Sequence, residues 1–159
     1  MLKYRLSLLI LVCFWANTAQ GQNFLHENKI KGLQGLKVVQ TQFRRNVMGF
    51  KVLSLDEIFD DFEFSMRQRL PELQYGKEGG NILELSYITD SDGGFVEVNI
   101  YRWVTLMATG EDIIANVWND KRVIMGGRPD RKSMRKCIDE IVLQLALDFM
   151  RANQKGERN

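Results

Sequence analysis

Apolar residues recur every three or four positions in two stretches of the chain, the spacing that places side chains on one face of an α-helix. The first stretch begins at the capping-box pair Ser54 and Glu57 and ends at Pro71, and the second follows Asp130 or Ser133. We therefore predict two amphipathic helices. Their apolar faces comprise Leu55, Ile58, Phe62, Met66 and Leu70 in the first, and Met134, Ile138, Ile141, Val142, Leu145 and Phe149 in the second.

The second helix carries another apolar stripe, roughly opposite its main one. This interaction stripe consists of Leu143, Leu147 and Met150, spaced four and three residues apart. Large apolar patches are uncommon on the surface of monomers. We therefore expect the stripe either to be covered by another element, for which Phe64 is a candidate neighbour, or to be a surface for self-association.

Shorter segments are rich in β-branched and aromatic residues or alternate apolar with polar residues, which is typical of β-strands. They cover residues 36–43, 81–88 and 95–118, and residues 123–127 are a further short candidate. With the helices they give the order β-α-β-β-β-α. We predict an α+β fold, a two-layer sandwich in which two helices cover one face of a mostly antiparallel sheet.

The segment 95–118 is long enough to fold back on itself as a hairpin. Gly110 and Glu111 suit a two-residue turn with glycine first, and this turn fixes a register in which Trp103 lies directly across from Trp118. The register gives each side chain a face, because side chains alternate along a strand. The predicted aromatic face comprises Tyr101, Trp103, Met107, Ile114 and Trp118, and the predicted core side comprises Val104, Leu106, Ala115 and Val117.

The aromatic face has two interpretations at this point. It is a candidate binding surface, because tryptophan and tyrosine are enriched at interfaces and also stack on sugar rings. Alternatively it is a minor core, covered by residues 22–35 or by the segment 119–127.

The start of the chain has the order of a secretory signal peptide. Lys3 and Arg5 precede an apolar run that is too short to span a bilayer, and small residues stand at Ala19 and Gly21. We predict a signal peptide over residues 1–21, a flexible segment over 22–35, and one α+β domain over 36–156. Cys13 lies inside the apolar run rather than in a lipoprotein box, so we expect no stable membrane anchor, and a periplasmic or extracellular location.

The charge balance restricts the kinds of partner that the protein can bind, and the cysteine content restricts its disulfides. The chain has 22 basic and 20 acidic residues, and without Lys3 and Arg5 both numbers are 20. A neutral domain lacks the basic surface that nucleic-acid binding requires, so no nucleic-acid partner is expected. Cys137 would be the only cysteine of the mature chain, which excludes an intrachain disulfide, and its place beside the helical stripe indicates a core residue.

The sequence offers little catalytic chemistry. His26 lies outside the predicted domain, so no triad can be assembled around an imidazole there. The DSDGG turn that begins at Asp90 has Tyr101 where a calcium loop needs glutamate, so no metal site is expected. No cofactor motif is present. One acidic group on the first helix is interpreted as a solvated face, namely Asp56, Glu57, Asp60, Asp61 and Glu63.

Four segments together resemble a group of small exported bacterial proteins of unknown function. They are DEIFDDFEFSMRQRL, the strand containing EVNIYRW, the tryptophan strand that leads to a glycine pair, and IVLQLALDFMRAN. A more distant similarity is to periplasmic assembly factors, including outer-membrane assembly lipoproteins. The resemblance implies the same fold order over nearly the whole mature chain, and no activity.

These observations favour an exported, non-enzymatic binding or envelope-assembly module that acts through protein contact. An alternative is a domain that binds a small ligand, a carbohydrate or a lipid, through the aromatic face. A hydrolase is the third reading, and it would require a pocket where polar side chains converge, with Asp120 or the acidic group in its wall.

Overall fold

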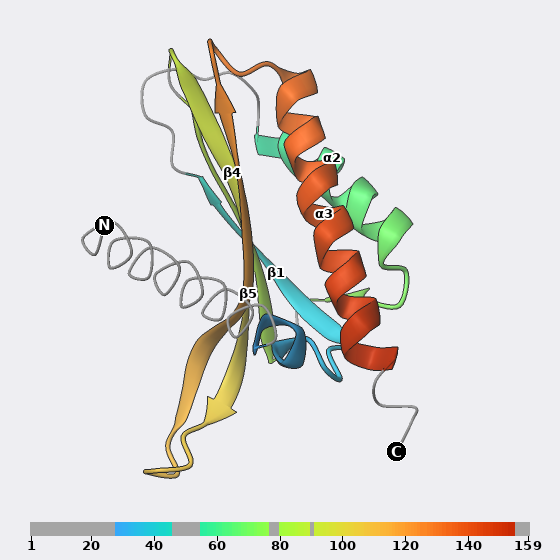
Figure 1. Cartoon of the computed structure of the whole chain (residues 1–159), viewed down its shortest axis with the longest axis vertical. Coiled ribbons are helices and arrows are strands. Elements are labelled where there is room, and N and C mark those ends of the chain that lie inside the picture. The colour runs from blue at the N-terminus through green and yellow to red at the C-terminus, as the bar shows by residue number, and fades with distance from the viewer. Residues whose placement is uncertain (1–27, 46–54, 77–79, 90, 155–159) are drawn as a thin grey trace, which may run out of the picture.

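A computed structural model describes residues 28–45, 55–76, 80–89 and 91–154. Two long helices cover one face of an open, mixed sheet of five strands in the order β2-β1-β3-β4-β5 (Figure 1). The predicted α+β class is confirmed. The elements are β1 Val38–Arg45, α2 Leu55–Arg69, β2 Gln74–Tyr75, β3 Asn81–Thr89, β4 Gly93–Thr105, β5 Asp112–Met125 and α3 Arg131–Gln154.

The sheet is antiparallel on one side and parallel on the other. Strands β3, β4 and β5 form two successive antiparallel pairs. Strand β1 runs parallel to β3, because the crossover through α2 returns the chain to the same end of the sheet before β3 begins. The two-residue strand β2 was not predicted. The short strand predicted at 123–127 is not a separate element, because β5 runs without a break from Asp112 to Met125.

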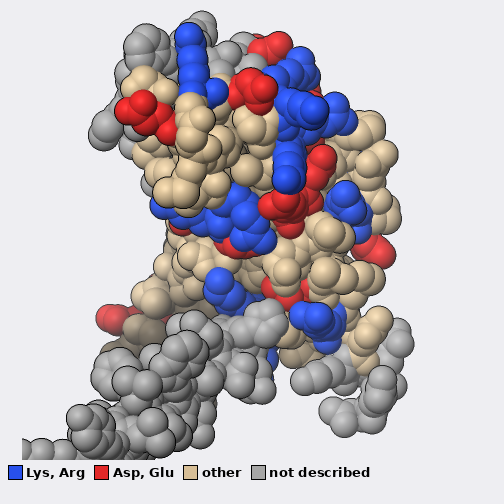
Figure 2. All heavy atoms as spheres, turned by 45° about the horizontal axis from the view of Figure 1, so that its top comes forward, with Lys and Arg blue, Asp and Glu red and all other residues tan. Residues whose placement is uncertain are grey.

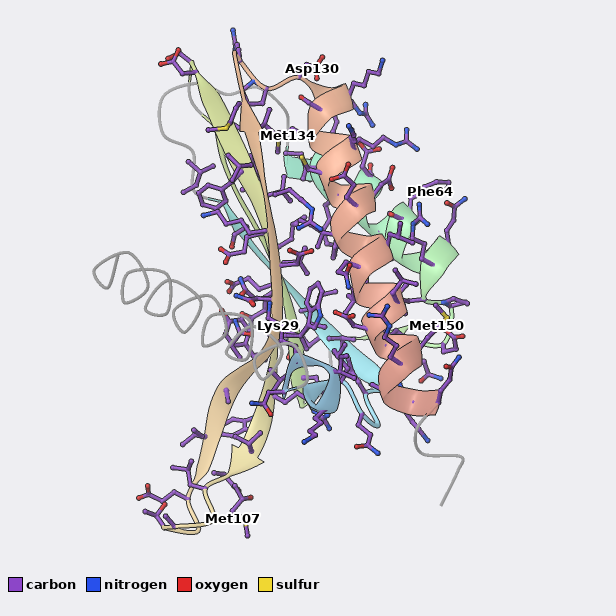
Figure 3. The ribbon with its side chains drawn as sticks, in the orientation of Figure 1. Lys29, Phe64, Met107, Asp130, Met134 and Met150 are labelled. Atoms are coloured by element: carbon purple, nitrogen blue, oxygen red, sulfur yellow. The ribbon has the colours of Figure 1, made fainter. Side chains whose placement is uncertain are left out.

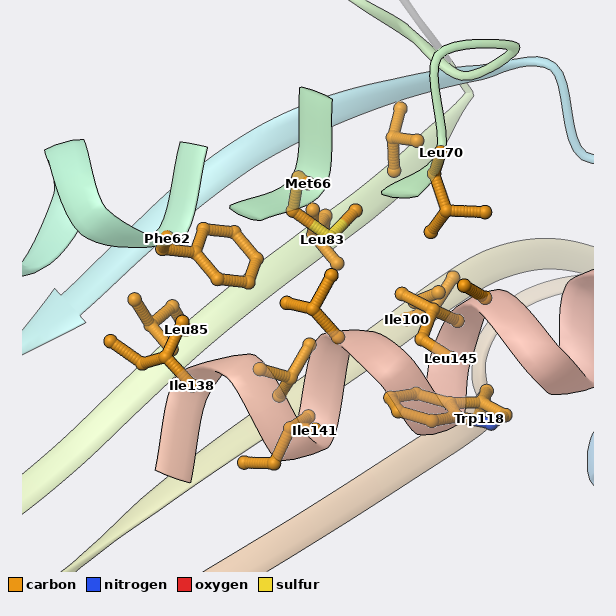
Figure 4. Packing of buried hydrophobic residues seen from close by; sticks show 14 of the residues in the cluster. Phe62, Met66, Leu70, Leu83, Leu85, Ile100, Trp118, Ile138, Ile141 and Leu145 are labelled. Atoms are coloured by element: carbon orange, nitrogen blue, oxygen red, sulfur yellow. The ribbon is translucent and has the colours of Figure 1, made fainter. Parts of the chain in front are cut away.

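Helix α2 forms as the apolar spacing predicts. Ile58, Phe62, Met66 and Leu70 are all at most 1 % exposed. Figure 4 shows Phe62, Met66 and Leu70 facing the core between the sheet and α3. The helix ends where the amide of Leu70 donates to the carbonyl of Met66, just before a proline that cannot continue the helical pattern. The predicted cap Ser54 lies outside the described residues.

Helix α3 begins at a reciprocal cap. The amide of Ser133 donates to Asp130 Oδ1 at 2.7 Å, and the amide of Asp130 donates to Ser133 Oγ at 3.1 Å. Two contacts fasten α3 to α2: Ser65 Oγ donates to Asp139 Oδ1 at 2.7 Å, and the Arg131 guanidinium pairs with carboxylates of α2. The main predicted stripe of α3 is buried against the sheet.

The core lies between the helices and the sheet face that they cover. Leu83, Leu85 and Tyr87 of β3 and the three apolar side chains Val96, Val98 and Ile100 of β4 form its floor. Burying one such side chain contributes about 1.5–3 kcal/mol. Cys137 is also buried, and burial raises the pKa of its thiol, as expected for a core residue.

Residues 28–35, the described part of the segment predicted to be flexible, pack against the domain. Residues 28–32 are helical, and Leu33 is fully buried in the core. Lys29 Nζ donates to the carbonyl of Asn119 at 2.8 Å, and Arg102 donates to the carbonyls of Gly32 and Gln34. A single helical turn is too short to show a period, so the pattern could not predict it.

The predicted signal peptide, 1–21, lies outside the described residues. Within the described ranges, no helix combines the length and the apolarity that a membrane crossing requires.

Candidate interaction surface

The hairpin between β4 and β5 has a longer turn than predicted. Strand pairing ends at Thr105 and Asp112, and the amides of Thr109 and Gly110 both donate to the carbonyl of Leu106. Gly110 has a φ of 73°, in the left-handed region that glycine adopts easily. It therefore stands at the end of the turn, whereas the predicted two-residue turn had it in the first position. The predicted two-residue turn is therefore wrong.

The longer turn shifts the register by four residues along β5, so that Trp103 lies across from Ile114 and not from Trp118. An even shift preserves the alternation of faces. For this reason Tyr101, Trp103 and Ile114 do share one face of the hairpin, as predicted.

Trp118 does not belong to that face, and the predicted Trp103–Trp118 pair is wrong. A β-bulge places Val117 as an extra residue between the pairs Tyr101–Asn116 and Ile100–Trp118. Trp118 therefore lies on the core side, where it is 1 % exposed and its indole N–H donates to Asp148 Oδ2 of α3 at 3.0 Å. No hydrophobic period reveals a bulge, so the residue pattern does not predict it.

The end of the hairpin exposes apolar side chains. The hairpin projects beyond the two helices, and Met107 lies at its far end (Figure 3). Leu106, predicted to pack beneath the helices, is 38 % exposed because the helices do not extend that far. We call this surface the hairpin tip: Trp103, Leu106, Met107, Ile113 and Ile114.

The hairpin tip is apolar on both of its faces. Trp103 pairs with Ile114 on one face, and Val104 pairs with Ile113 on the other. Met107 is fully exposed to solvent. Sequence reasoning missed Leu106 and Ile113 because it placed one whole face of the hairpin in the core.

The interaction stripe of α3 is exposed, which leaves self-association as the remaining prediction for it. Leu143, Leu147 and Met150 are 44 %, 36 % and 47 % exposed, and Phe64 of α2 does not cover them, being 53 % exposed itself. Phe64 and Met150 both lie on the sides of their helices away from the sheet (Figure 3). The guanidinium of Arg135 lies 5.9 Å from the centre of the Phe64 ring.

The charged side chains form mixed surfaces. Basic and acidic side chains lie next to one another over the face shown in Figure 2. Among the pairs are Arg131 with Glu57 and Asp61, and Arg67 with Glu63. The predicted acidic group on α2 is thus partly neutralised by its neighbours, and exposed pairs of this kind contribute about 0–1 kcal/mol each.

A cavity where β5 meets α3 has Asp120 in its wall, which is the position that the hydrolase interpretation requires. Asp148 accepts hydrogen bonds from Trp118 and Gln144, and Asp120 Oδ1 accepts one from Arg122. Asp120 Oδ2 is buried and has no partner among the described residues. Within those residues no group of three or more His, Cys, Asp and Glu side chains could hold a metal ion.

No family model and no curated protein matches the chain. The solved structures that align with it include the following two. A minor lipoprotein from Acinetobacter baumannii is 8 % identical over 76 % of this chain and 95 % of its own, with a TM-score of 0.30. A homolog of neuraminyllactose-binding hemagglutinin from Helicobacter pylori is 11 % identical over 78 % of this chain and 87 % of its own, with a TM-score of 0.31. Likenesses at this level assign no function to the chain.

Proposed function

We propose that the protein is an exported, non-enzymatic binding module that contacts a protein partner through the hairpin tip. The observation that carries the proposal is the exposure of five large apolar side chains at the end of a hairpin that extends beyond the protein's own core. Contiguous exposed apolar residues at one site are typical of interaction surfaces.

The chemistry of the tip favours a protein partner over a sugar. Trp103 is 58 % exposed, but the second tryptophan of the expected stacking platform is buried in the core. The residue across from Trp103 is Ile114, and the nearest polar pair on the same face, Thr105 and Asp112, is already hydrogen-bonded to itself at 2.6 Å. Methionine adapts its shape to irregular protein surfaces.

The two-sided apolar character indicates how the tip would dock. A surface that binds a flat partner needs only one apolar face, whereas here Ile114 and Ile113 point to opposite sides of the hairpin. We infer that the tip inserts into a groove. Full burial of Trp103, Met107 and Ile114 would contribute on the order of 1.5–3 kcal/mol for each side chain.

Site-specific photo-crosslinking in the cell envelope tests this function. A benzophenone side chain at position 107 should form a discrete adduct with one protein, and Ile114→Asp should abolish that adduct. A benzophenone at Lys121, which is exposed on the same strand outside the tip, should form none. Val123→Asp is the matched control for Ile114→Asp, because Val123 is 60 % exposed on β5 and lies outside the tip.

Two results would contradict the proposal. One is an equal adduct pattern from positions 107 and 121. The other is a saturable shift of the fluorescence of Trp103 on titration with a panel of sugars, which would make the tip a carbohydrate site.

A further inference from the structure

A cavity of about 390 Å³ lies between α2 and the edge of the sheet formed by β1 and β2. It is separate from the hairpin tip and from the interaction stripe. Its volume falls in the range of about 300–1,000 Å³ that is typical of small-molecule sites. The residues that line it include Gln40, Phe59, Phe62, Glu63, Met66 and Tyr75.

The wall of the cavity is apolar apart from a few polar groups. Phe62 and Met66 are buried core residues whose side chains reach the cavity, and Phe59 is half-buried beside them. Two aromatic rings and a thioether form a surface that suits an aliphatic chain.

Tyr75 supplies a polar group that its own fold leaves unused. Its hydroxyl is buried and has no hydrogen-bond partner among the described residues. Burial raises the pKa of Tyr75 well above its ordinary value, and the nearby Arg67 lowers it less than burial raises it. The phenol therefore stays protonated at every physiological pH and can donate a hydrogen bond.

The charges at the cavity indicate an uncharged ligand. Glu63 is the only acidic or basic residue in the described wall, and its carboxylate is paired with Arg67. A ligand carboxylate entering the cavity would meet Glu63 and would find no lysine or arginine among the described lining residues. A neutral carbonyl oxygen is not repelled in this way by Glu63 and can accept a hydrogen bond from the Tyr75 hydroxyl.

We propose that this cavity binds a neutral lipid-like molecule, an aliphatic chain with a carbonyl oxygen that accepts a hydrogen bond from the Tyr75 hydroxyl. The chain packs on Phe59, Phe62 and Met66. The volume corresponds to roughly a dozen non-hydrogen atoms, taking the ~30 Å³ of one water molecule in the liquid as the unit. An acyl chain of medium length is of this size.

Titration of the whole mature chain with nonan-2-one, followed by calorimetry and by amide chemical shifts, tests the proposal. We expect saturable binding to one site, with the largest shifts at residues 59–66 and at Tyr75. Tyr75→Phe keeps the ring and removes the donor, so it should weaken binding about fivefold, the contribution of one neutral hydrogen bond. Tyr101→Phe is the matched control and should leave the affinity unchanged.

Two further probes separate the hydrogen bond from simple apolar burial. For 2-methylnon-1-ene, a hydrocarbon in which a methylene replaces the oxygen, wild type and Tyr75→Phe should bind equally. Nonanoate should bind more weakly than the ketone at pH 8. The proposal is overturned if nonan-2-one shows no saturable binding, if Tyr75→Phe binds it as tightly as wild type, or if the shifts lie at the hairpin tip.

Discussion

Two tryptophans of one hairpin have opposite roles at the scale of single residues. Trp118 is buried and donates its indole N–H to Asp148, which is only 2 % exposed, whereas Trp103 is largely in water. A carboxylate that loses its donor inside a protein is costly, because water cannot replace the lost hydrogen bond. Stability and binding should therefore be separable by changing one tryptophan at a time.

We expect Trp118→Phe to lower the free energy of unfolding by about 1.5–3 kcal/mol, since it leaves Asp148 Oδ2 without its donor and removes apolar volume. Trp103→Phe, the matched control, should change it by about 0.5 kcal/mol or less, as is usual for exposed sites. Urea unfolding of both variants measures this. Equal losses would show that Trp103 is buried too.

Tyr75 provides an opposite case, in which removing a polar group should do no harm. Tyr75→Phe deletes a buried hydroxyl that has no partner among the described residues, so the free energy of unfolding should stay constant or rise by up to about 1 kcal/mol. Thermal unfolding without any added ligand checks this. A clear loss of stability would mean that the hydroxyl is already bonded within the protein.

At the scale of elements, the helix that begins at Asp130 depends on a charged cap. Hydrogen bonds from the Ser133 side chain, and then from its amide, lower the pKa of the Asp130 carboxyl below its ordinary value of 3.8. A group whose pKa falls on folding stabilises the protein above its unfolded pKa, and this contribution is lost as the pH drops through the folded pKa.

We therefore expect Asp130→Ala to lower the melting temperature at pH 7, and the difference from wild type to shrink as the pH falls below about 4. Calorimetry at a series of pH values measures the difference. Asp130→Asn caps the helix without titrating, so its melting temperature relative to Asp130→Ala should not depend on pH. A wild-type difference that is constant down to pH 2 would exclude a charged cap.

The helical residues 28–32 pack so closely on β5 that one added methyl group should destabilise the protein. A Cβ atom on Gly32 would lie 2.7 Å from both the Cβ atom and the carbonyl oxygen of Val117, closer than real side chains approach. We expect Gly32→Ala to destabilise the protein by about 1–3 kcal/mol. Gly80→Ala is the control, since its methyl group would meet Trp103 at an ordinary 3.7 Å. Urea unfolding that gave equal values for both variants would show that residues 28–32 are not packed on β5.

The sequence predicts these elements unequally, for physical reasons. Helices α2 and α3 follow from their apolar spacing and from residues such as Asp130, because the signal is local. The register of the hairpin depends on whether Gly110 opens or closes the turn, and both choices satisfy the glycine. The bulge at Val117 and the cavity at Tyr75 depend on contacts between distant segments, which no pattern along one segment records.

At the scale of the whole molecule, apolar side chains that the core does not use gather at the hairpin tip and at the interaction stripe of α3, besides Val123 and Met125 near the end of β5. In Figure 3, Met107 lies at the far end of the hairpin, and Met150 lies on the side of α3 away from the sheet. A protein with two such surfaces can bind a partner with one and a second copy of itself with the other.

We expect the mature chain to self-associate through the interaction stripe, with sedimentation that depends on concentration in the micromolar range, where the binding free energy is about −8 kcal/mol. Leu147→Asp should give a monomer at every concentration. Met107→Asp, which places the same charge on the hairpin tip, should leave the association intact. A wild type that is monomeric throughout would leave the exposed stripe without a role.

The extra residue Val117 separates two parts of the hairpin whose sequences can change independently in evolution. Codons on the core side of the bulge specify the packing of Trp118 under α3. Codons beyond it specify a hairpin end whose two faces are both apolar. Adding or deleting one codon in each strand there would swap the two faces of the hairpin end, and no charged side chain would be buried by the swap. Each added pair carries the tip about 3.4 Å farther from the body. Under the proposed function, the length of the hairpin can therefore change together with its binding partner during evolution while the core stays constant.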